Sequence, residues 1–100
     1  MKIRYLSVAE LEFDEAVAWY LARSRSAARH FVREVAITER LLREHPRIGR
    51  CVEHDVRSLC VNDFPYSIIY SVEKDEIAVV AVAHQSRRPG YWIDRLREIH

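Results

Sequence analysis

The chain has 100 residues, 49% of them hydrophobic, which is the length and apolar content of one domain with a single core. Its formal net charge of +1 at pH 7 argues against a strongly basic nucleic-acid-binding protein. No apolar run approaches the roughly 20 residues that span a bilayer, so no membrane association is expected. Two cysteines and no charged-then-apolar leader favour a soluble, cytoplasmic protein.

The first residues predict one strand followed by a helix. Residues 2–6 alternate polar and apolar side chains, which is typical of a short strand. Over residues 8–22, apolar side chains recur at spacings of three and four, as on a helix with one buried face. Ser7 and Glu10 have the spacing of a capping box, in which each side chain bonds the other residue's backbone amide. A capped helix over residues 8–22 is therefore expected.

A second helical stripe follows after a short break. Apolar residues recur from Ala28 to Leu42, and either Ser24 or Ser26 can cap the start of this helix. Pro46 disfavours helical backbone in the residue before it, so the helix should end at His45. Because so few residues separate the two helices, they should form an antiparallel hairpin.

The second half of the chain predicts strands. Residues 56–61 and 65–72 read as strands joined by a tight turn, and a polar turn at residues 73–76 leads to a third strand. This third strand, residues 77–83, is apolar at every position, as in a central strand covered on both faces or one beside a partner's surface. A loop at residues 87–90 should precede a short terminal helix over residues 91–99.

The resulting order is β-α-α-β-β-β-α, which predicts one α+β domain over residues 1–100. A helical hairpin should pack on one face of a small, mainly antiparallel sheet. The other face should stay partly open, as a shallow basic cleft lined by Arg57 and by the tail after Ala83.

Several stretches resemble one known family. Residues 56–59 (VRSL) precede residues 64–70 (FPYSIIY), and residues 77–84 (IAVVAVAH) precede residues 87–92 (RRPGYW) and Arg95. Together with a helical hairpin ending in Glu-His-Pro, they resemble the RelE/ParE toxin superfamily of type II toxin–antitoxin systems, which includes plasmid stabilisation proteins. The resemblance implies the same fold and a cognate antitoxin that forms a hetero-oligomer with the toxin.

The resemblance leaves the molecular target open. The first hypothesis is a ribosome-dependent, metal-independent mRNA endonuclease that inhibits translation, with the ribosome and mRNA as partners. The second is a DNA gyrase inhibitor without catalytic activity of its own. Some nuclease relatives end near a tyrosine that matches Tyr91 and carry more lysines, so this chain's helix past Tyr91 and its few lysines leave room for the gyrase type. The third is a degenerate toxin that acts with its antitoxin in repression of their operon.

For mRNA cleavage the resemblance implies roles for particular residues. Arg57 and Arg87 would stabilise the charged phosphorane, His84 would act as acid or base, and Tyr91 would stack on a base or handle a proton. Each residue also has a structural alternative. Arg57 could be a solvated strand residue and Arg87 an ordinary surface charge. His84 could be a packed histidine, and Tyr91 could anchor the terminal helix. Three further arginines are expected to bind RNA: Arg50, Arg88 and Arg95.

No metal or cofactor is expected. Cys51, His54 and Cys60 could suggest a zinc site, but the sequence lacks the paired CxxC and HxxxH elements that such sites use. Phosphate-binding loops, dinucleotide fingerprints and HExxH motifs do not occur either.

Overall fold

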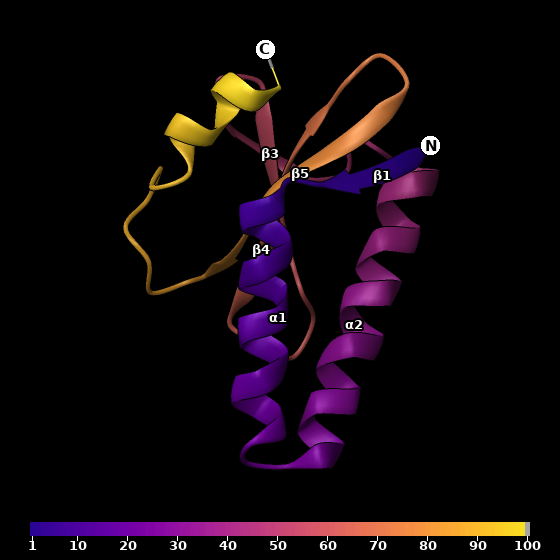
Figure 1. Ribbon diagram of the computed structural model, residues 1–100. Helices are drawn as coiled ribbons and strands as arrows, with labels where there is room; N and C mark the ends of the chain where they lie inside the picture. The colour runs from indigo at the N-terminus through magenta and orange to yellow at the C-terminus, as the bar shows by residue number, and fades with distance from the viewer. Residues whose placement is uncertain (100) are drawn as a thin grey trace.

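In the computed structural model, which describes residues 1–99, two antiparallel helices lie side by side against a five-stranded sheet (Figure 1). After β5 the chain turns back and ends in a short helix (yellow in Figure 1). Over these residues no helix combines the length and the apolar character needed to cross a membrane. The elements, in chain order, are β1 (Lys2–Tyr5), α1 (Ser7–Leu21), α2 (Arg25–Glu44), β2 (Arg50–Glu53), β3 (Val56–Cys60), β4 (Tyr66–Val72), β5 (Glu76–His84) and the 3-10 helix η1 (Ile93–Glu98).

The sheet has the strand order β1-β5-β4-β3-β2. β1 runs parallel to β5, with Lys2 opposite Glu76 and Tyr5 opposite Val79, and every other neighbouring pair is antiparallel. Residues 77–83 of β5 are all buried, as their apolar run predicts. The structure thus confirms an α+β fold with a helical hairpin on a mainly antiparallel sheet.

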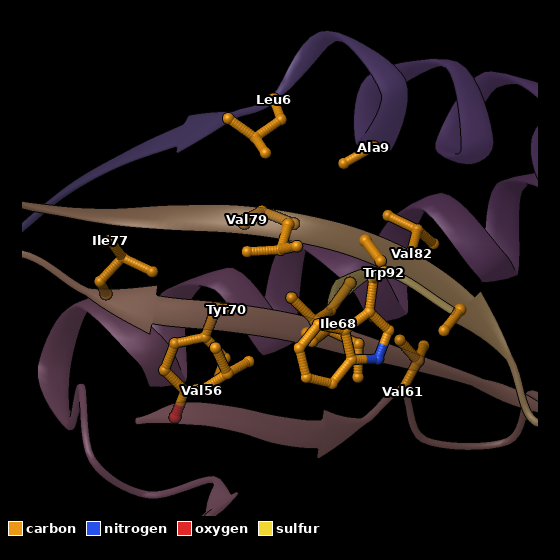
Figure 2. Close-up of a cluster of buried hydrophobic side chains, with 14 of the residues drawn as sticks. Leu6, Ala9, Val56, Val61, Ile68, Tyr70, Ile77, Val79, Val82 and Trp92 are labelled. Carbon is orange, nitrogen blue, oxygen red and sulfur yellow. The ribbon is translucent and has the colours of Figure 1, made fainter. Parts of the chain in front are cut away.

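Much of the core lies between the helical hairpin and the sheet, and Trp92 and Leu96 of the C-terminal segment belong to the same buried cluster. Phe31 and Leu42 of α2 are fully buried, and so is Ala9 of α1, because the apolar stripes of both helices face the strands. Figure 2 shows part of this core, including Tyr70 of β4. Burial of each large aliphatic side chain stabilises the fold by about 1.5–3 kcal/mol.

The two helix starts differ in how they are capped. Ser24 caps α2 as expected, because its side chain accepts a hydrogen bond from the Ala27 amide at 3.1 Å. The capping box predicted for α1 is wrong: Leu6 is the capping residue, and no side-chain cap forms. The Leu6 amide instead donates to the Val79 carbonyl at 3.0 Å, so pairing with β5 continues to the residue before Ser7, which begins the helix.

Two elements depart from the expected order. β2 was not predicted, and it pairs with β3 through a two-residue turn at His54 and Asp55, both with positive φ (54° and 62°). The terminal helix is present, but it has 3-10 geometry and spans only Ile93–Glu98. The amide of Arg95 accordingly donates to the carbonyl of Trp92, three residues earlier.

Candidate functional site

The sheet face opposite the helical hairpin carries an open groove of about 520 Å³. Tyr66 of β4 contacts Phe31 of α2, with ring centroids 5.3 Å apart, so it points toward the helices. Successive strand residues point to opposite faces, so Ser67 and Ile69 point the other way, into the groove. The segment that follows β5 forms the groove's other wall.

Most of the residues expected at the site meet in this groove, but Arg57 and Arg95 lie outside it. Three of its arginines are exposed, and the acidic residue Glu53 also lines it. This excess of positive charge suits a polyanion or the acidic segment of a protein. The expected residues that line the groove are Arg50, His84, Arg87, Arg88 and Tyr91.

Arg57 lies on the helix-covered face, so the expectation that it lines the open cleft is wrong. It pairs in register with Tyr70, whose hydroxyl accepts a buried hydrogen bond from the Gly49 amide at 2.9 Å. Nη1 of Arg57 donates to the carbonyls of Gly49 and Arg47, at 2.9 and 3.1 Å. These bonds connect β3 to the segment between α2 and β2. Ser58, the residue after Arg57, points into the groove instead.

His84 ends β5 at the edge of the groove. Its Nδ1 lies 3.0 Å from the amide of Ser86, which donates to it, and 2.8 Å from the Ser86 hydroxyl. Because a backbone amide donates to Nδ1, the neutral imidazole carries its proton on Nε2. The ring also meets Tyr66 edge to face, with centroids 5.1 Å apart. The strand and the turn therefore fix the orientation of this imidazole.

Glu12 of α1 organises the C-terminal segment, and sequence reasoning missed it. Its carboxylate accepts from both terminal nitrogens of Arg95, at 2.8 and 2.9 Å, and from the Tyr91 hydroxyl at 2.8 Å. It also accepts from the Val82 amide at 3.0 Å, while Arg95 donates to the Val80 carbonyl at 3.1 Å. β1 pairs with β5 only as far as Val79, opposite Tyr5. The cluster therefore covers the edge of β5 at the residues that follow, which β1 does not reach.

The same cluster changes the acid–base properties of Tyr91. Burial, the hydrogen bond to Glu12 and the negative charge of that carboxylate together raise the pKa of the Tyr91 hydroxyl to about 12. The hydrogen bond with Glu12 also raises the pKa of Arg95. The Arg87 guanidinium lies 3.9 Å from the centre of the Tyr91 ring, a cation–π contact. Near neutral pH, the Tyr91 hydroxyl therefore keeps its proton and donates a hydrogen bond to the Glu12 carboxylate.

The raised pKa of Tyr91 predicts how stability changes in alkali. An unfolded tyrosine ionises near pH 10, so the protonated hydroxyl stabilises the fold below that pH and loses this contribution as pH rises through about 12. The difference in unfolding free energy between wild type and Tyr91→Phe should shrink from pH 9 to pH 11.5 in urea titrations. A difference that stays constant over this range would contradict the assignment.

Comparison with known proteins agrees with this architecture. The family model described as ParE toxin of type II toxin–antitoxin system, parDE, matches residues 3–89. A chain of the chromosomal ParDE TA system from P. aeruginosa has a similar structure, with a TM-score of 0.75 and 20% sequence identity, covering 84% of this chain and 95% of that one. At this identity the likeness shows the fold alone. No curated protein matches the chain. Because the family model spans most of its length, the chain belongs to the ParE toxin family of type II toxin–antitoxin systems.

Proposed function

We propose that this chain inhibits DNA gyrase by binding to it and does not cleave mRNA. The observation that supports this reading is that residues expected to carry out cleavage make structural contacts instead. Arg57 donates to two backbone carbonyls on the other face of the sheet, and the Tyr91 hydroxyl is bound to Glu12. This choice reverses the order of the two hypotheses drawn from the sequence.

The chemistry of mRNA cleavage explains why these contacts matter. Attack by a ribose 2′-hydroxyl needs a base, cations that stabilise the phosphorane, and an acid for the leaving oxygen. His84 and Arg87 remain in the groove, but Tyr91 has a raised pKa and its hydroxyl already donates a hydrogen bond to a carboxylate. A binding function needs only a complementary surface, so it tolerates these contacts.

The groove and its surroundings have features of a binding surface. Its exposed arginines offer charge-assisted hydrogen bonds to an acidic partner. A second hollow, about 390 Å³ in volume, borders α1 and shares His84 and Arg87 with the groove. Trp19 lines it and is 51% exposed, and exposed tryptophans are typical anchors of protein interfaces. The proposed target implies that the toxin acts in the bacterial cytoplasm.

Membership of the family supports a cognate antitoxin protein as the second partner, in a toxin–antitoxin hetero-oligomer. A shallow hollow on the outer side of the helical hairpin is lined almost entirely by apolar surface from Val17, Leu21 and Val32. Arg25 and Arg29 flank it, so it suits an amphipathic antitoxin helix with acidic residues at its edges.

A direct test compares the two targets with one protein preparation. Purified toxin, incubated with gyrase, relaxed plasmid and ATP, should block supercoiling and accumulate cleaved DNA, and preincubation with the antitoxin should prevent this. The same toxin should leave mRNA intact on programmed ribosomes. Cleaved message with unaffected gyrase would restore the endonuclease hypothesis. Harmless expression without the antitoxin, with neither target affected, would favour the degenerate toxin.

Charge reversal tests whether the groove is the gyrase-binding surface. Arg87→Glu should weaken gyrase inhibition by about tenfold or more, because a like charge at an interface disfavours an acidic partner. Arg40→Glu is the matched control, since Arg40 is exposed on α2 and does not line the groove. Equal inhibition by both variants would move the binding surface elsewhere.

A further inference from the structure

Three potential metal ligands converge between α2 and the turn that joins β3 to β4, at a place that the proposed toxin function does not use. Nε2 of His30 lies 3.1 Å from a carboxylate oxygen of Asp63 and 3.6 Å from one of Glu34. The ligand atoms of all three side chains lie within 4.8 Å of one another. His30 and Asp63 are 33 residues apart, so spacing along the chain does not indicate this cluster.

We propose that His30, Glu34 and Asp63 bind one Zn²⁺ ion, with water as the fourth ligand. Zinc bonds to nitrogen and oxygen are about 2.0–2.1 Å long, so neighbouring ligands of a tetrahedral site lie about 3.3–3.4 Å apart. The distances of 3.1 and 3.6 Å from Nε2 to the two carboxylates bracket this separation.

The chemistry of the ligands favours zinc over the common hard cations. Ca²⁺ and Mg²⁺ take oxygen ligands, and Mg²⁺ retains much of its water. An imidazole with two carboxylates suits Zn²⁺ and neighbouring first-row metals instead. With a neutral imidazole the set has two negative charges, which a divalent ion balances.

The fold holds the donors near these positions before any ion binds. His30 and Glu34 are four residues apart on α2, so they lie on the same face of the helix. Asp63 has a φ of 70° in a turn where the Phe64 amide donates to the Val61 carbonyl at 3.4 Å. The Phe64 ring meets the His30 ring edge to face, with centroids 5.0 Å apart, and restricts its rotation. A bound ion would link the helical hairpin to the sheet.

The test uses the full chain without an affinity tag, first stripped of metal by a chelator. Calorimetric titration with zinc chloride should give one ion per chain, and the unfolding temperature should rise progressively with the concentration of free zinc. Magnesium chloride should not. His30→Ala and Asp63→Asn should each weaken zinc binding by at least about tenfold, since even partners of metal ligands contribute that much. Asp63→Asn preserves side-chain size and tolerates the positive φ.

His45→Ala is the matched control, because His45 is an exposed histidine at the end of the same helix and lies outside the cluster. It should bind zinc like the wild type. Cobalt substitution adds a readout of geometry: its tetrahedral absorption bands should appear in wild type and His45→Ala and be lost in His30→Ala. The proposal fails if the wild type binds no zinc, or if folded His30→Ala binds it with unchanged affinity. In the second case His30 only forms ion pairs with the two carboxylates.

Discussion

Replacing Glu12 with alanine is expected to lower the free energy of unfolding by about 3 kcal/mol, the cost of breaking a buried ion pair from one side. The side chains of Glu12 and Arg95 are only 12% and 16% exposed, so water compensates little for the lost contacts. The variant also leaves the Val82 amide and the Tyr91 hydroxyl without their acceptor. Urea unfolding followed by circular dichroism measures the change.

Asp14→Ala is the control for this experiment, because Asp14 is an exposed acidic residue of the same helix; its loss should change stability by less than about 0.5 kcal/mol. In a double-mutant cycle, Glu12→Ala and Arg95→Ala together should cost less than the sum of the single changes. Additive losses, or a Glu12→Ala variant as stable as Asp14→Ala, would show that the cluster does not hold the C-terminal segment.

Gly49→Ala should destabilise the protein by about 2–3 kcal/mol through overpacking. A Cβ atom at this position would lie 2.6 Å from the Tyr70 hydroxyl oxygen and 3.0 Å from the Ser58 carbonyl oxygen. Tyr70 is fully buried in the core, so its ring has no room to retreat. The shift in the urea midpoint at an unchanged slope measures the loss.

Removing the Tyr70 hydroxyl separates this clash from other effects of the glycine. Tyr70→Phe alone should cost about 1–2 kcal/mol, because the buried Gly49 amide loses its acceptor. In the Gly49→Ala background the same change should recover part of the stability, since it removes the shortest contact. The steric explanation is wrong if Gly49→Ala leaves the free energy of unfolding unchanged. It is also wrong if Tyr70→Phe lowers the stability of the Gly49→Ala variant by as much as it lowers that of the wild type.

Elements with a clear hydrophobic period could be predicted from the sequence. The stripes of α1 and α2 gave both helices to within a few residues, and the continuous apolar run of β5 indicated its burial on both faces. β2 escaped prediction because it is short and mostly exposed and its turn uses His54 and Asp55 at positive φ. Turns of this kind usually carry asparagine and glycine, so the usual signal is absent.

The groove was only partly predictable. The resemblance brought His84, Arg87 and Tyr91 together correctly, since they lie close in the chain around one strand end. Arg57 was placed on the wrong face, because strand alternation is known only once the register with Tyr70 is known. The role of Glu12 depends on contacts with residues 70 to 83 positions later, and local sequence patterns carry no information about such contacts.

The pairing of β1 with β5 also bears on how the toxin is made. Residues 2–5 find their partners only at residues 76–79, and α1 packs on the same late strand. A nascent chain released by the ribosome before β5 is complete therefore lacks the strand on which β1 and α1 pack. Translation products that end before β5 should therefore stay unfolded, whereas the full chain can fold.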